Sequence, residues 1–168
     1  PVRADKAASI AELRAELQRV RIAQAAHVPE GAWLSIAYTL DVAERIQRDF
    51  KLQSEAWRQR AVRYLALASQ AKDPMLAQRG KLVMRGYRSA ASELLQGYGI
   101  YLPAGYDPAR SYPLMIVLHG GSANGNLFLA VVLGNNMNWK EYSLHLWDDY
   151  EARVAPDWIV VAPDGFGQ

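Results

Sequence analysis

Two uninterrupted apolar runs, residues 114–118 (LMIVL) and 158–162 (WIVVA), constrain the fold of this chain more than any other feature. Strands that are apolar at every position are typical of parallel sheets, where helices cover both faces. About forty residues separate the two runs, enough for the crossover of a dozen or more residues that a parallel pair needs. We expect a helix at about 139–154 inside this connection. The sequence therefore predicts a parallel β-α-β unit and the α/β fold class.

Two further strands are predicted upstream, at about 82–88 and 98–102. The second segment is rich in residues that favour strands, and Pro103 closes it. The first contains Gly86 and shows no clean helical stripe. A polar break at 89–93 lies between them, which favours an antiparallel hairpin.

The first 80 residues carry helical rather than strand signals. Helices are expected at 9–26, at 32–50 and from about Ser54 to the Asp73-Pro74 break, each with apolar residues at a spacing of three and four. Ser9 and Glu12 form a capping-box pattern at the start of the first helix. We expect these helices to form a small bundle.

The charge distribution supports a domain boundary near residues 80–95. Residues 1–95 hold sixteen Lys and Arg against ten Asp and Glu, whereas residues 96–168 hold three against seven. The predicted domains are a helical domain, 1–80, and the N-terminal part of an α/β domain, 81–168. The basic charges alternate with acidic ones along helical faces, so we expect no nucleic-acid partner.

Composition excludes several classes of function. The chain has no cysteine, which rules out disulfides, thiolate metal sites and a cysteine nucleophile within it. Its longest apolar run has seven residues, far too few to cross a bilayer, so no membrane partner is expected. Nothing at its start resembles a signal peptide, and since a cleaved secreted protein looks the same, localisation stays open.

The segment after the first apolar run carries the chemistry. His119, Gly120, Gly121 and Ser122 follow it directly, and Asp164 follows the second run at the same predicted sheet edge. Ligands of open parallel sheets bind beyond the carboxyl ends of the strands. Adjacent glycines let backbone N–H groups approach a developing negative charge. A phosphate-binding loop is the alternative, although the Walker lysine and the Gly-x-Gly-x-x-Gly spacing are absent.

These motifs resemble the esterase and prolyl-oligopeptidase-like branch of the α/β-hydrolases, which includes polyester depolymerases and feruloyl esterases. The resemblance covers roughly residues 82–168, through YLPAGY at 101–106, YPL at 112–114 leading to LHGG at 118–121, and VVAPDG at 160–165. It implies a sheet with the strand order 1-2-4-3-5-6-7-8. The third strand would then pair with the fourth and with a fifth that lies after Gln168.

The resemblance also assigns site residues. Gly121 is expected to donate one backbone N–H of an oxyanion hole, with Gly120 and Ser122 shaping the loop and His119 and Asp164 serving as its scaffold. We also expect Tyr101, Asn124 and Phe166 to form part of the wall of the substrate pocket. The Ser/Asp/His triad is expected after Gln168, because the chain has no Gly-x-Ser-x-Gly elbow. No cofactor and no metal is expected.

Other polar residues have simpler interpretations. His145 is expected to pack within a helix, His27 to lie at a helix break on the surface, and Asp148 and Asp149 to lie on a solvated face.

The resulting hypothesis is the N-terminal portion of a serine hydrolase that acts on an ester or a peptide through an acyl-enzyme. We expect the C-terminal remainder to be its partner as a separate chain, produced by cleavage after Gln168; truncation is the other explanation. Ester against peptide specificity and a homodimer stay open. The alternative function is a non-catalytic helical interaction module fused to a hydrolase remnant.

Overall fold

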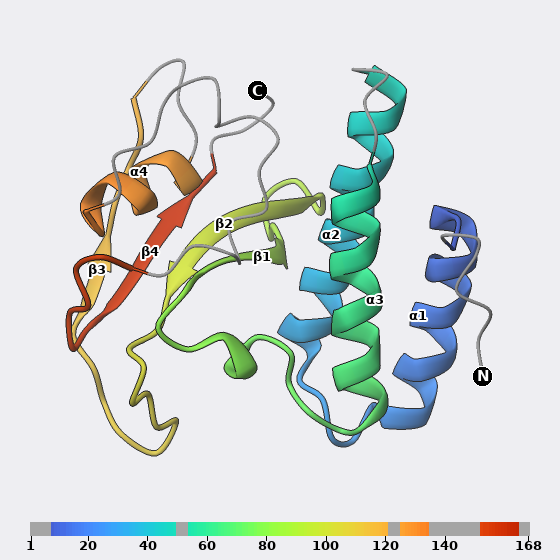
Figure 1. Ribbon diagram of the computed structural model, residues 1–168, viewed down its shortest axis with the longest axis horizontal. Helices are drawn as coiled ribbons and strands as arrows, with labels where there is room; N and C mark the ends of the chain where they lie inside the picture. The colour runs from blue at the N-terminus through green and yellow to red at the C-terminus, as the bar shows by residue number, and fades with distance from the viewer. Residues whose placement is uncertain (1–7, 50–53, 121–124, 135–151, 165–168) are drawn as a thin grey trace. The chain divides into compact units, whose positions relative to one another are not determined.

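The computed structural model describes residues 8–49, 54–120, 125–134 and 152–164, and has a mixed α/β fold (Figure 1). The helices are α1 (Ile10–Gln24), α2 (Glu30–Asp49), α3 (Glu55–Ser69), the 3-10 turn η1 (Leu76–Gln78) and α4 (Gly125–Val132). The strands are β1 (Leu82–Arg88), β2 (Leu95–Tyr101), β3 (Leu114–Ile116) and β4 (Ile159–Pro163). None of the described helices is long and apolar enough to span a membrane.

The chain divides into two compact units. One consists of Pro1–Pro74 and Gly86–Leu95, and the other of Met75–Arg85 and Gln96–Gln168. The turn of the β1–β2 hairpin therefore groups with the helices, whereas the outer parts of both strands group with the rest of the sheet.

The three predicted N-terminal helices are confirmed, and they pack on one another. Their predicted apolar stripes supply most of the buried residues: Leu13, Leu17 and Val20 from α1, Trp33, Ile36, Leu40, Ala43 and Ile46 from α2, and Trp57, Ala61, Tyr64, Leu65 and Ala68 from α3. Ala23, which continues the three-and-four spacing of apolar residues in α1, is exposed. The helical unit thus has a core of its own.

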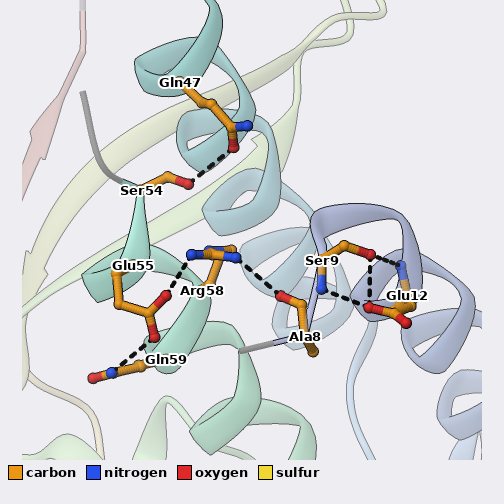
Figure 2. A network of polar contacts seen from close by, with 8 residues as sticks. All are labelled: Ala8, Ser9, Glu12, Gln47, Ser54, Glu55, Arg58 and Gln59. Atoms are coloured by element: carbon orange, nitrogen blue, oxygen red, sulfur yellow. Dashed lines mark hydrogen bonds and ion pairs between the residues drawn. The ribbon is translucent and has the colours of Figure 1, made fainter. Parts of the chain in front are cut away.

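The predicted capping box at the start of α1 is confirmed. The Glu12 N–H donates to the Ser9 hydroxyl over 3.2 Å, and the Ser9 N–H donates to the Glu12 carboxylate over 2.7 Å, as Figure 2 shows. Ser54 precedes α3, but its hydroxyl accepts no N–H of that helix; it donates to the Gln47 side chain over 3.2 Å. Two backbone N–H groups at the start of α1, those of Ser9 and Glu12, are thus satisfied reciprocally.

Ser9→Ala should lower the stability of the protein by about 1 kcal/mol, since an N-cap serine satisfies a helix N–H that alanine leaves open. For a protein of this size, that is a fall of about 2–4 °C in the thermal unfolding midpoint. Ser69→Ala, at the exposed carboxyl end of α3, is the matched control and should change the midpoint little. Equal shifts in the two variants would contradict the capping role.

Gly86 in β1 lies in close contact with α2 within the helical unit. A Cβ on Gly86 would lie 2.6 Å from the Leu34 carbonyl oxygen and 2.6 Å from the Tyr38 Cβ. The Gly86 N–H donates to the Ser35 hydroxyl over 3.1 Å, and that hydroxyl donates to the Gly31 carbonyl over 2.6 Å. The strand therefore lies directly on the helix backbone, where no side chain fits.

The four strands form one mixed sheet in the order β1-β2-β4-β3. β2 is antiparallel to β4, with Tyr98 opposite Pro163 and Tyr101 opposite Val160. β3 is parallel to β4, with Leu114 opposite Ile159. The expected position of the fourth strand, between the second and the third, is confirmed, as is the parallel pair.

The helix in the crossover differs from the predicted one. α4 occupies Gly125–Val132, in a segment for which no helix was predicted, and it packs on β4 (Figure 1). The predicted helix at 139–154 lies mostly outside the described residues, and residues 152–154 are not helical. The α4 sequence is apolar almost throughout, so it shows no helical period for a sequence argument to detect.

The prediction that residues 114–118 form a strand buried on both faces is wrong for the described structure. β3 ends at Ile116, and Leu114, Ile116 and Leu118 are 58%, 60% and 74% exposed. Among the described residues, β3 is the last strand of the sheet and is paired only along its β4 edge. β4, by contrast, is central, and its Val160 and Ala162 are fully buried.

Candidate functional site

The carboxyl ends of β3 and β4 meet at one edge of the sheet because the two strands are parallel. His119 and Gly120 follow β3 there, Asp164 follows β4, and α4 begins beside them at Gly125. This edge is the candidate site.

Asp164 links three elements at this edge. Its carboxylate accepts a hydrogen bond of 2.8 Å from the backbone N–H of Gly125, the first residue of α4. Its own N–H donates to the carbonyl oxygen of Gly97 in β2 over 3.2 Å. A carboxylate at a helix N-terminus also interacts favourably with the helix dipole. β2, β4 and α4 are therefore tied together through one residue.

Gly125 is the point of closest approach between α4 and β4. A Cβ there would lie 2.3 Å from the Ala162 carbonyl oxygen and 2.8 Å from that of Pro163. The helix therefore starts directly on the strand backbone. The sequence alone gives no sign of this contact, because it is made with residues about forty positions later in the chain.

The arrangement weighs against the phosphate-binding alternative. A helix N-terminus binds phosphate through free backbone N–H groups and the positive end of the dipole. Here the Gly125 N–H is already bonded to a carboxylate, whose negative charge would repel a phosphate.

Asn126, next to Gly125, is a polar residue that sequence analysis missed. Its side chain is 4% exposed and lies against Gly99 of β2, where a Cβ would come within 2.7 Å of the Asn126 Oδ1. Among the described residues, that Oδ1 accepts no hydrogen bond. Gly99 thus makes room for a buried amide under the first turn of α4.

His119 interacts within its own loop. Its Nδ1 lies 2.9 Å from the carbonyl oxygen of Gly120, and the side chain is half-buried. Because a carbonyl oxygen only accepts, this contact requires the proton on Nδ1. The contact is local and holds the backbone at Gly120.

The remaining predicted site residues fall into two groups. Gly121, Ser122, Asn124 and Phe166 lie outside the described residues, as do His145, Asp148 and Asp149. Tyr101 is described, but the structure does not bring it to the candidate site. Because β2 is antiparallel to β4, Tyr101 pairs with Val160 near the opposite end of the sheet, and it is 1% exposed. Burial raises the pKa of its phenol, and the charge of Asp157 raises that pKa further.

No metal centre is apparent in the described part of the chain, where no three His, Cys, Asp or Glu side chains gather as ligands. His27 is exposed beyond the end of α1, as expected.

The helical unit has a hollow of about 560 Å³ between the first turn of α1, the end of α2 and the start of α3. Its charged lining includes Arg14, which pairs with Asp41 and Glu44 over 2.6 and 2.8 Å, and Arg58, which pairs with Glu55. Arg58 also donates to the Ala8 carbonyl over 3.3 Å (Figure 2). These cations are already neutralised, so the hollow shows no anion site.

Comparisons with protein-family models, with curated proteins and with solved structures find no match for this chain.

Proposed function

We propose that this chain is the N-terminal portion of a serine hydrolase with the α/β-hydrolase fold, which cleaves an ester or a peptide bond through an acyl-enzyme. The observation that carries the proposal is the sheet order β1-β2-β4-β3, with β2 antiparallel to β4 and β3 parallel to it. The resemblance of residues 82–168 to that superfamily implies this order. The parallel direction of β3 and β4 places His119, Gly120 and Asp164 at one edge of the sheet.

In this proposal, the chain supplies electrostatic stabilisation and the C-terminal remainder of the polypeptide supplies the triad. The serine hydroxyl gives its proton to the triad histidine and attacks the carbonyl carbon of the substrate, so that the carbonyl oxygen becomes an oxyanion. The oxyanion then collapses to the acyl-enzyme, and the alcohol or amine leaves with that proton. The Gly121 N–H donates to that oxyanion, while Gly120 and Ser122 shape the loop. The remainder adds a second N–H, from the residue after the nucleophile.

The edge of β3 away from β4 is unpaired among the described residues, and this favours a partner strand. The Pro113 carbonyl accepts from the Ile159 N–H over 2.9 Å, and the Val117 N–H donates to the Val161 carbonyl over 2.8 Å. Backbone polar groups alternate in direction along a strand, so those of Leu114 and Ile116 point away from β4. Their side chains are exposed and uncharged, and such an edge favours pairing with another strand. We propose that a strand from the C-terminal remainder binds there.

A fluorophosphonate probe tests the proposal, because it labels an activated serine covalently. The complete polypeptide that carries this chain should be labelled. If it is cleaved after Gln168, the label should lie on a companion of about 20 kDa or more, the size needed for the remaining strands. Cleaved material without such a companion would contradict the two-chain arrangement. The absence of label from a folded complete polypeptide would overturn the hydrolase proposal and favour a non-catalytic interaction module.

A further inference from the structure

One face of the sheet is apolar and uncovered where β3 pairs with β4. In the register of this parallel pair, Leu114 lies beside Ile159 and Ile116 beside Val161, and neighbours of this kind project to the same face. Leu114 and Ile116 are 58% and 60% exposed, and the two β4 side chains are half-buried. None of the four carries a charge or a hydrogen-bonding group. These four residues form what we call the β3–β4 face.

α4 lies on the opposite face of the sheet. Ala162 is fully buried, and its partner in β2 is Gly99. A Cβ on Gly99 would lie 2.9 Å from the Leu129 Cδ2 of α4, so the helix packs on the side to which Gly99 and Ala162 project. Side chains alternate between the two faces along a strand, and Val161 therefore projects to the other side. The β3–β4 face is the one that α4 leaves open.

The position of α4 determines where a further crossover can pass. α4 belongs to the connection from β3 to β4, and crossovers between parallel strands are right-handed in about 98% of cases. A strand parallel to β3 at its other edge can follow β4 only through a second crossover, usually a helix. That crossover leads across the sheet in the reverse direction, so the same handedness places it on the opposite face. It therefore passes over the β3–β4 face.

We propose that the β3–β4 face binds an amphipathic helix of the C-terminal remainder, which leads from β4 to a strand parallel to β3. This inference rests on the proposed function, in which that remainder completes the enzyme. The face offers only apolar side chains, so burial of apolar surface is what recognises the helix. The helix should therefore present apolar residues at positions i, i+3, i+4 and i+7 to the sheet.

The absence of cysteine from this chain allows a direct test of burial in the complete polypeptide. Leu114→Cys and Ile116→Cys each place a thiol in the β3–β4 face, and maleimide labelling of the peptide that carries it is measured in the folded protein and in urea. Folding should slow the labelling by roughly tenfold or more, because a covered thiol reacts only when the structure opens. Ile22→Cys is the matched control, since Ile22 is 81% exposed on α1, and folding should slow its labelling by less than about threefold.

Replacement of Ile116 by the photoreactive p-benzoylphenylalanine then identifies the occupant. In the complete polypeptide, the cross-link should reach a segment after Gln168 whose apolar residues recur at a spacing of three and four. A cross-link to a segment without this spacing, to residues 1–168 or to a second copy would overturn the proposal, and so would the absence of a cross-link.

Folded Leu114→Cys and Ile116→Cys proteins that react as fast as Ile22→Cys would also overturn the proposal. If one cysteine variant does not fold, the other decides together with the cross-link. A cross-link to a helical segment after Gln168 in a polypeptide that fluorophosphonate does not label would overturn the proposed function and leave the binding surface established.

Discussion

Replacement of Gly121 by proline should lower the fluorophosphonate labelling rate and kcat of the complete enzyme by roughly a hundredfold or more. Loss of one oxyanion-hole donor typically costs on the order of 10²–10³ in rate. Proline has no backbone N–H, so this substitution removes the proposed donor itself rather than a side chain near it. KM should change less than kcat, because the donor acts mainly on the charge that develops in the transition state.

Gly121→Ala is the matched control for this experiment. Alanine keeps the N–H and adds only a methyl group, so its activity should stay well above that of the proline variant. Thermal unfolding midpoints of the two variants should be compared, so that a folding defect is not taken for a loss of chemistry. Unchanged turnover in a folded Gly121→Pro enzyme would refute the assignment of Gly121 as an oxyanion donor.

Local sequence signals predicted the local structure well. The Ser9–Glu12 pattern specifies a capping box through residues three positions apart, and the structure has it. The helical stripes depend on a spacing of three and four, and β4 on an uninterrupted apolar run, both of which are short-range signals. The strand order of the sheet followed from a resemblance over several motifs, and the four described strands have that order.

Contacts between distant segments account for what the sequence did not predict. The composition of residues 114–118 indicates a strand that can be buried on both faces. Burial also depends on the elements that pack around the strand, and among the described residues β4 is the only strand beside β3. Tyr101 lies in a motif shared with the resembled family, yet the antiparallel direction of β2 takes it away from the candidate edge. Gly125 has no room for a side chain because β4 lies against it, and no local sequence pattern predicts this contact.

Gly86→Val should lower the free energy of unfolding by roughly 3 kcal/mol or more. The valine Cβ would lie 2.6 Å from the Leu34 carbonyl oxygen and 2.6 Å from the Tyr38 Cβ, so β1 has to move away from α2. Overpacking of this kind costs about 1–3 kcal/mol. Movement of the strand also breaks the Gly86–Ser35 hydrogen bond, and a buried N–H left without a partner costs about 1–3 kcal/mol more. The expected fall in the thermal midpoint is about 6–12 °C.

Gly86→Val is a decisive test, because the strand preferences of valine and glycine alone predict a gain in stability rather than a loss. Valine favours strands and glycine weakens them, so a strand position without close neighbours would gain stability from the same substitution. Gly105→Ala supplies the control for the glycine effect, because a Cβ at Gly105 meets no atom within 4 Å and its substitution should change the midpoint little. A Gly86→Val protein as stable as the parent would show that β1 does not pack on the α2 backbone as described. A large fall in the thermal midpoint for Gly86→Val, together with little change for Gly105→Ala, would show that β1 contacts the α2 backbone at Gly86.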